Sequence, residues 1–448
     1  MNSIIFCHKQ LARLAIPNFL TTLSVPLLGI VDTALAGHMA KVEDLAALAL
    51  ATILFQLIYW LFGFLRMGTT GSIAQSQNEG IIRPEAIQIL WNSSLLALAI
   101  ALSLVFFQTP IFNLYYYISG ADPLTTKLST SYSEIRIWAA PATLLNYVIH
   151  GWYLGIQNPW IPLALTTLIQ ILNIILNFLL AYGCNMGVEG LALATLIAQW
   201  IGFIIGFVHL YRNHRIARAS LIIDYQKVLS VLHNNVDLLI RTLLLMISIH
   251  SLSWFAARLG PSPLAASAII LQLLGLLSYG LDGIALSCES LVGQAVGLKD
   301  KNQLWKVIRT GFIWGLISSL LFSMIFWFGL PWLISIFTDK QYLIDICLQW
   351  KVFIVIAPLV CFVCFIWDGI YVGALRTQAM RNSMFFSTFI VYLPSTIILL
   401  PTFGMNGLWS AYLLFMASRG ITLSLWAKKE MSNSITRISK SDSPANST

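Results

Sequence analysis

Residues 86–109 read AIQILWNSSLLALAIALSLVFFQT and contain no charged side chain. As an α-helix this stretch would rise about 36 Å, because each residue adds about 1.5 Å. The hydrocarbon core of a bilayer is roughly 30 Å thick, and about 20 mostly apolar residues cross it. The stretch therefore predicts a transmembrane helix.

Comparable apolar stretches follow one another along the chain, with short polar segments between them. Several exceed the ~20 residues that a span needs, which indicates tilt or extension beyond the bilayer. The predicted fold class is an all-α membrane protein with twelve transmembrane helices. These spans lie near residues 11–37, 45–72, 86–109, 131–155, 161–182, 188–211, 236–257, 264–295, 304–329, 344–374, 382–402 and 405–427.

The composition excludes an ordinary soluble protein. Of the 448 residues, 58% are hydrophobic and only 10% are charged, whereas soluble domains carry about 25% charged residues. A net charge of +8 would suggest nucleic acid in a soluble protein, but here the basic residues lie in the short segments between spans. We expect the lipid bilayer as a partner and no nucleic acid.

The basic residues also predict the orientation of the chain. If the N-terminus lies in the cytoplasm, the opposite side of the membrane holds only four basic residues outside the spans, namely Lys41, Lys127, Arg258 and Lys340. Cytoplasmic loops are the ones enriched in Lys and Arg. We expect a multi-pass protein of the inner (plasma) membrane with both termini in the cytoplasm.

Motifs of the first half return in the second half at an almost constant offset. Such spacing indicates a tandem duplication of six helices, and an even number of helices keeps both copies in the same orientation. The predicted division is an N-terminal lobe at 1–211, a cytoplasmic linker at 212–228, a C-terminal lobe at 229–428 and a disordered tail at 429–448. The recurring positions are Leu45-Ala46-Ala47 with Leu264-Ala265-Ala266 and Gln75 with Gln294 (offset 219), Gly151 and Gly155 with Gly369 and Gly373 (218), and Gly187 and Gly190 with Gly404 and Gly407 (217).

Asp32 is the first candidate for ion coupling, because it lies well inside the first predicted span. A carboxylate at membrane depth is expensive and is a functional candidate for that reason. Pro17 and Pro26 precede it and remove backbone hydrogen bonds, so we expect the helix to bend. A bending helix with a carboxylate could act as a protonation switch. The structural alternative is an aspartate that only binds neighbouring helices.

Asn173 and Asn177 form a second candidate site, since a spacing of four places them on one helix face. Thr195 follows on the next predicted span, which a short loop would bring alongside. With Asp32 these residues could build an oxygen-rich site for a proton relay or a cation. The alternative is a polar contact between helices, which is common in membrane bundles.

The second half contains three intramembrane carboxylates that could act in coupling or in substrate binding. Asp282 and Glu289 lie seven residues apart on one predicted helix, and Asp368 lies on the tenth span. Asp237 is followed four residues later by Arg241, so we expect those two residues to pair. A structural role is the alternative for each carboxylate.

Several ordered motifs carry a resemblance to a known family. The chain resembles the multidrug and toxin extrusion (MATE) family and is most similar to its DNA-damage-inducible protein F branch, from the start of the chain to about Lys428. The matching stretches are Leu14-Ala15-Ile16-Pro17, residues 25–34 (VPLLGIVDTA), residues 64–71 (FLRMGTTG), Leu281-Asp282-Gly283 and Met380-Arg381-Asn382-Ser383.

The resemblance implies twelve helices in two six-helix lobes and the export of cationic or amphipathic compounds, driven by protons or sodium. It implies that Asp32 is the central coupling residue and that Pro17 bends the helix. Asn173 and Thr195 match the family's site, but Asn177 stands where the family has an aspartate. Because sodium prefers carboxylate oxygens, this change favours protons. We expect a proton as the coupling ion, with Na+ as the alternative. We expect no cofactor and no bound metal.

Other functions compete with a proton-coupled, monomeric multidrug antiporter. A sodium-coupled drug antiporter and a flippase for lipid-linked precursors are the alternative transporters. A membrane-embedded enzyme would need a nucleophile with its base, a metal cluster or paired aspartates, and the seven His form no such pattern. A receptor or channel would not require the duplication. We therefore expect a transporter of drug-like small molecules and no enzyme.

Overall fold

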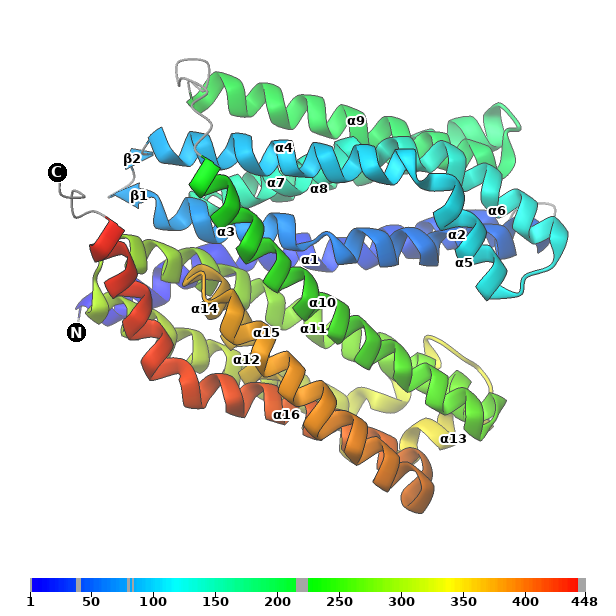
Figure 1. Cartoon of the computed structure of the whole chain (residues 1–448). Coiled ribbons are helices and arrows are strands. Elements are labelled where there is room, and N and C mark those ends of the chain that lie inside the picture. The colour runs from blue at the N-terminus through cyan, green and yellow to red at the C-terminus, as the bar shows by residue number, and fades with distance from the viewer. Residues whose placement is uncertain (1, 38–41, 79–80, 83, 215–224, 442–448) are drawn as a thin grey trace. The chain divides into compact units, whose positions relative to one another are not determined.

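The computed structural model describes residues 2–37, 42–78, 81–82, 84–214 and 225–441 (Figure 1). Side chains are described at 6–24, 44–77, 84–181, 183–213 and 235–436. Helices make up almost all of these residues. The strands of the described chain are β1 (Gln77–Asn78) and β2 (Ile81–Ile82), which pair with each other.

The first six predicted spans lie in the helices that precede residue 215. Several of them are built from more than one helical piece: a turn at residues 62–63 divides the second span, and the winding of the helix changes within the fourth and fifth spans. The elements are α1 (Asn2–Gly37), α2 (Val42–Leu61), α3 (Phe64–Gln75), α4 (Pro84–Phe106), α5 (Gln108–Ser119), α6 (Pro123–Arg136), the 3₁₀ turn η1 (Ile137–Ala139), α7 (Ala140–Gly155), α8 (Trp160–Asn177), the π-helical turn η2 (Phe178–Gly183) and α9 (Gly187–His214).

The last six predicted spans lie in the helices that follow residue 224. Within the described residues of the whole chain, nine helical stretches are long and apolar enough to cross a membrane, and one of these, Thr377–Thr436, contains two predicted spans. The elements are α10 (Tyr225–Leu259), α11 (Pro261–Gly297), α12 (Lys301–Ser335), α13 (Gln341–Gln349), α14 (Lys351–Gly373), α15 (Thr377–Phe385), the π-helical turn η4 (Phe386–Tyr392) and α16 (Leu393–Ser441).

A glycine turn separates the two spans within Thr377–Thr436. Gly404 interrupts α16 with a φ of 56°, in the left-handed region that glycine adopts without strain. Its repeat partner Gly187 has the same φ of 56° and begins α9. Three residues later, Gly190 lies so close to Ala181 that a Cβ would come 2.8 Å from its backbone nitrogen. A Cβ on Gly407 would come closer still, 2.0 Å from the carbonyl oxygen of Leu399.

Paired glycines also bring helices into backbone contact in the first repeat. A Cβ on Gly151 of α7 would lie 2.8 Å from the carbonyl oxygen of Arg66. One on Gly155 would lie 3.0 Å from the carbonyl oxygen of Thr70. These distances are too short for a side chain, so the α7 backbone rests directly on α3. Small residues spaced by four are a common means of close helix packing in membranes.

The second repeat reproduces this contact at equivalent residues. A Cβ on Gly369 of α14 would overlap the carbonyl oxygen of Ala285 on α11, and one on Gly373 would overlap that of Glu289. Ala285 and Glu289 follow Arg66 and Thr70 by the offset of 219 found in the sequence. The glycines that recur in the sequence therefore make equivalent backbone contacts in the two repeats.

The contacts between residues divide the chain into two compact units. The N-unit comprises Leu23–Ile73 and Ile82–Val231, and the C-unit comprises Met1–Thr22, Ala74–Ile81 and Leu232–Thr448. Both units thus draw on the first repeat, because the start of α1 and the end of α3 belong to the C-unit. The four-part division predicted above stays a prediction.

Each unit has its own aromatic core. In the N-unit, the ring of Phe55 lies 6.4 Å from those of Phe112 and Tyr132. In the C-unit, Trp350 and Trp409 lie 6.1 Å apart within a cluster of buried side chains from α10 to α16. Such edge-to-face and tilted ring pairs add stability beyond the area that they bury.

Large apolar side chains also cover the outside of the helices. Phe106 and Phe328 are each 79% exposed and Leu425 is 74% exposed. A protein in water rarely exposes so much apolar surface, so this surface suits lipid. α16 continues as a helix to Ser441, although the Ser- and Asn-rich composition predicted disorder from residue 429. Met431 and Ser434 in this part of α16 are buried, and their burial favours the helix.

We predict that Gly373→Ala destabilises the protein, because its Cβ would overlap the backbone of α11. Overpacking of this kind typically costs about 1–3 kcal/mol. Gly329→Ala is the matched control, since nothing lies within 4 Å of a Cβ at Gly329. Thermal unfolding in detergent should show a lower midpoint for Gly373→Ala alone. Equal midpoints for both variants would contradict the backbone contact.

Candidate coupling site

A chain of polar side chains, two of them buried and one half-buried, joins α8 to α9 in the N-unit. Asn177 Nδ2 donates to Asn173 Oδ1 at 3.0 Å, and Asn173 Nδ2 donates to Thr195 Oγ1 at 2.9 Å. The Thr195 hydroxyl in turn donates to the carbonyl oxygen of Leu191 at 3.1 Å. Both asparagines are only 1% exposed. The structure thus brings together three of the residues that the sequence singled out.

α1 reaches the same face of α8. Gln170 Nε2 donates to Ser24 Oγ at 3.2 Å, and Gln170 precedes Asn173 and Asn177 by three and seven residues on α8. Residues at these spacings share one helix face. The part of α1 that follows Ser24 therefore begins beside the polar chain of α8.

Asp32 and Pro26 lie within the helical span of α1, but their side chains are outside the described residues. Pro17 is described and buried, and its carbonyl oxygen accepts the hydroxyl of Thr21 at 2.8 Å. The coupling role of Asp32 and the bending roles of Pro17 and Pro26 stay predictions.

Asp368 lies at the centre of a buried ion triad in the C-unit. Arg241 Nη2 and Arg419 Nη2 both donate to Asp368 Oδ2, the second at 2.7 Å. The three residues are 8%, 2% and 8% exposed in the order Arg241, Arg419, Asp368. The triad carries one surplus positive charge and ties α10, α14 and α16 together. These contacts favour a structural role for Asp368 over proton exchange or substrate binding.

Asp237 takes part in a separate ion pair. Arg381 Nη1 donates to Asp237 Oδ1 at 2.6 Å, and the Thr377 hydroxyl donates to Asp237 Oδ2 at 3.1 Å. The sequence spacing predicted a pair between Asp237 and Arg241, whereas the ion pair of Arg241 is made with Asp368. A spacing of four predicts only contacts within one helix, so it could not predict these partners, which lie more than a hundred residues away in the chain.

Asp282 and Glu289 lie on α11 in the C-unit, as their spacing predicted. Glu289 is 1% exposed, and its carbonyl oxygen is the backbone atom that faces Gly373. Asp282 is partly buried. Coupling or substrate roles for these carboxylates stay predictions.

Arg136 is a half-buried residue whose contacts were not predicted from the sequence. It donates to the hydroxyl of Tyr132 one turn earlier, and its guanidinium lies 5.0 Å from the ring centre of Phe55. Arg136 lies near the start of the fourth predicted span, 131–155. Its guanidinium also lies 5.5 Å from the ring centre of Tyr132, and the spacing of four was the signal that could have indicated this second cation–π contact.

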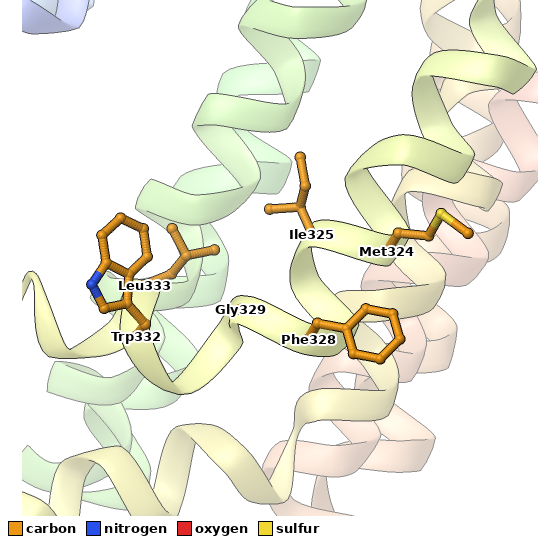
Figure 2. A pocket seen from close by; sticks show the side chains of 6 residues that line it. All are labelled: Met324, Ile325, Phe328, Gly329, Trp332 and Leu333. Carbon is orange, nitrogen blue, oxygen red and sulfur yellow. The ribbon is translucent and has the colours of Figure 1, made fainter.

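A hollow of about 420 Å³ lies on α12, beside Gly329 (Figure 2). Its lining is apolar and contains no ionisable group. Figure 2 shows Phe328 and Trp332 on either side of the glycine, with Met324 and Ile325 one turn earlier and Leu333 completing the wall. This hollow therefore offers no chemistry for ion coupling.

Comparison with known proteins supplies the family. The family model described as MatE matches residues 17–179 and 238–398. The two matched blocks cover most of the chain, and each falls in one of the two repeats. The chain belongs to the MatE family.

Individual relatives agree with this assignment. DNA damage-inducible protein F of Escherichia coli is 33% identical over 429 residues, which cover 94% of this chain and 92% of that protein. A probable multidrug resistance protein NorM of Acinetobacter baylyi is 25% identical over 408 residues, 86% of each chain. These findings confirm the family and the branch that the sequence motifs predicted.

Solved structures confirm the fold. The Vibrio cholerae MATE transporter VcmN in its bent form superposes on this MatE protein with a TM-score of 0.85 at 20% identity, over 97% of this chain and 99% of that one. A transporter of the MOP superfamily from Pyrococcus furiosus gives a TM-score of 0.82 at 19% identity, over 96% of each chain. The twelve-helix, two-bundle fold is thus confirmed. The protein is an integral, multi-pass membrane transporter and no enzyme.

We predict that Asp368→Asn strongly destabilises the C-unit, because two buried arginines would lose their counter-charge. Removing one partner of a buried ion network typically costs about 3–5 kcal/mol. Adding Arg241→Gln to this variant removes one of the two arginine charges and should recover part of the loss. Thermal midpoints of the two single variants and the double variant form the test. Additive losses in the double variant would contradict the triad.

Proposed function

We propose that this MatE-family transporter exports cationic or amphipathic drug-like molecules in exchange for inward protons, by alternating access. The observation that carries the proposal is the polar chain of the buried Asn173 and Asn177 with the half-buried Thr195 beside α1. Its relative in Acinetobacter baylyi is named a probable multidrug resistance protein, which supports drug-like molecules as the substrate class. Membrane interiors exclude such polar groups unless they serve packing or function.

The helix register supports Asp32 as the proton carrier of this site. Asp32 follows Ser24 by eight residues, and Asn177 follows Gln170 by seven. These distances along the two helices correspond to rises of about 12 and 10 Å. α1 and α8 are the first and fifth predicted spans and so cross the membrane in the same direction. Because Ser24 contacts Gln170, Asp32 and Asn177 should therefore lie at a similar depth in the membrane.

The amide at position 177 favours a proton over sodium. Its Nδ2 donates to the side-chain oxygen Oδ1 of Asn173, so it engages an oxygen that a cation would otherwise use. An aspartate at this position would add a negative charge and two acceptor oxygens, which hard cations prefer. A proton on a single carboxylate needs no such set of ligands.

We also propose the inner membrane as the location, with both termini in the cytoplasm and a monomer as the working unit. The charge asymmetry of the short loops supports this orientation. Each repeat supplies six spans, so one chain provides both bundles that alternating access requires.

A flippase for lipid-linked precursors is the second candidate. The surplus positive charge of the triad around Asp368 favours it, because Arg241 and Arg419 are interior residues that could attract an anionic headgroup. Deletion of the gene distinguishes the two functions. Accumulation of a lipid-linked precursor together with unchanged drug sensitivity would support the flippase and contradict drug export.

We predict that Asp32→Asn abolishes drug efflux, because an amide cannot take up and release the coupling proton. Asp345→Asn is the matched control, since Asp345 is exposed on α13 and accepts only a local hydrogen bond from Gln341. Ethidium efflux from cells that lack their own pumps measures both. Efflux at the parental rate in Asp32→Asn would disprove the proposed coupling role.

We predict that Asn177→Asp makes transport respond to sodium, because it restores a carboxylate beside Asn173. Efflux into sodium-containing and sodium-free media of equal ionic strength is the measurement. The parent protein should export at the same rate in both media, and the variant should export faster with sodium. A parent that already requires sodium would contradict proton coupling.

A further inference from the structure

The ion triad of the C-unit contains more positive charge than its one carboxylate can balance. Both guanidinium groups donate to the same oxygen, Asp368 Oδ2, so two cations share a single anion. Arg241 is 8% exposed and Arg419 is 2% exposed. Burying a charge is costly unless a counter-charge accompanies it. The triad would therefore be stabilised by one further anion.

The two arginines also have hydrogen-bond donors that lack a strong acceptor. The Nε of Arg241 is buried and has no hydrogen-bond partner among the described residues. Nη1 of Arg419 donates to the thioether sulfur of Met416 at 3.2 Å, and a thioether is only a weak acceptor. An unsatisfied donor inside a membrane costs free energy, because no bulk water reaches it. An anion beside these groups would satisfy them.

The neighbouring side chains do not balance the second arginine. Within the described part of the chain, both arginines form their salt bridges with Asp368 alone. Asp237 lies one turn before Arg241, but it is engaged by Arg381. The other ionisable side chains that interact with Arg419 are two thiols and a phenol, which are neutral at pH 7 in their ordinary state. These are Cys361, Cys364 and Tyr412.

The first repeat packs its helices without these charges. At the sequence offsets of 219, 218 and 217, the positions equivalent to the triad hold Thr22, His150 and Gly202. The glycine contacts of α7 with α3 are nevertheless equivalent to those of α14 with α11. The close packing of these helices therefore does not require two arginines. Their presence in the second repeat alone favours a role besides packing.

The charge and the burial of the site favour a small monovalent anion. One surplus positive charge is balanced by one negative charge. All three side chains of the triad are at least nine-tenths buried. A monatomic anion needs about the space of one water molecule, whereas a phosphate group or an organic acid needs several times more. These features favour a halide, and chloride is the halide that cells contain in quantity.

The triad lies near one end of the spans that carry it. Asp368 is five residues from the end of its apolar span, and Arg241 is six residues from the start of its span. These spacings correspond to rises of about 8 and 9 Å. Both ends lie on the side that the loop charges predict to be cytoplasmic. The exposed Lys428 and Lys429 follow on the same side, and basic groups raise the local concentration of anions.

We propose that one chloride ion binds beside Arg241 and Arg419 as a fourth member of the triad, and that it stabilises the C-unit. The donors assigned to the ion are Arg241 Nε and a guanidinium N–H of Arg419. Asp368 keeps its structural role between the two arginines. The inference goes beyond the proposed export of drug-like molecules and does not depend on it.

Thermal unfolding in detergent tests the site on the whole protein. Sodium chloride replaces sodium gluconate in steps, at constant pH and ionic strength. A ligand of the folded state stabilises it by mass action, so the midpoint should rise and then level off. We expect a rise of about 3–6 °C when chloride exceeds its dissociation constant tenfold. A midpoint that is the same in chloride and in gluconate would overturn the proposal.

Two arginine variants separate a bound ion from a general effect of salt. Arg241→Gln removes the surplus charge and leaves Arg419 paired with Asp368, so its midpoint should no longer respond to chloride. Arg258→Gln is the matched control, because Arg258 is an exposed arginine on the same helix that lies over the ring of Trp254. It should keep the full response. Equal chloride responses in the two variants would overturn the proposal.

Bromide locates the ion without any variant. In crystals of the parent protein grown with bromide in place of chloride, an anomalous scattering peak should lie in contact with Arg241 Nε. Density there without an anomalous signal would be a water molecule and would overturn the proposal. Sodium phosphate should not raise the thermal midpoint as chloride does. A rise with phosphate and none with chloride would overturn the chloride site in favour of a site for a phosphate headgroup.

Discussion

The contact between the α14 glycines and the α11 backbone is the constraint on which the C-unit depends. Lipid is as apolar as a leucine side chain, so membrane helices gain little from hydrophobic burial and rely on close packing. Gly369 and Gly373 remove the side chains that would hold α14 away from α11. Asp368 stands next to Gly369, and this packing fixes its position between Arg241 and Arg419.

The same packing in the two repeats supports different chemistry. In the N-unit, α7 rests on α3 through Gly151 and Gly155, and the nearby spans α8 and α9 share a neutral chain of amides and a hydroxyl. In the C-unit, charged side chains join the helices. In the proposed site the single carboxylate, Asp32, would change its charge when it gains a proton, whereas Asp368 in the ion triad is already paired with two arginines. This difference is why we place coupling in the N-unit.

The sequence predicted the features that depend on local patterns. Apolar length predicted the spans, the repeat offsets predicted equivalent backbone contacts, and a spacing of four predicted that Asn173 and Asn177 lie together. It could not predict the partners of Asp368, because Arg241 and Arg419 lie 127 and 51 residues away in the chain. It also could not predict that Gly283 contacts the backbone of Phe19, because the sequence does not show which glycines of a helix contact another helix.

Proton-driven exchange is the central claim, and purified protein in liposomes tests it most directly. In sodium-free buffer, an imposed pH gradient alone should drive movement of a cationic dye against the direction of proton flow. An ionophore that collapses the gradient should stop this movement. Dye movement that persists without a pH gradient, or that follows only a sodium gradient, would contradict the account.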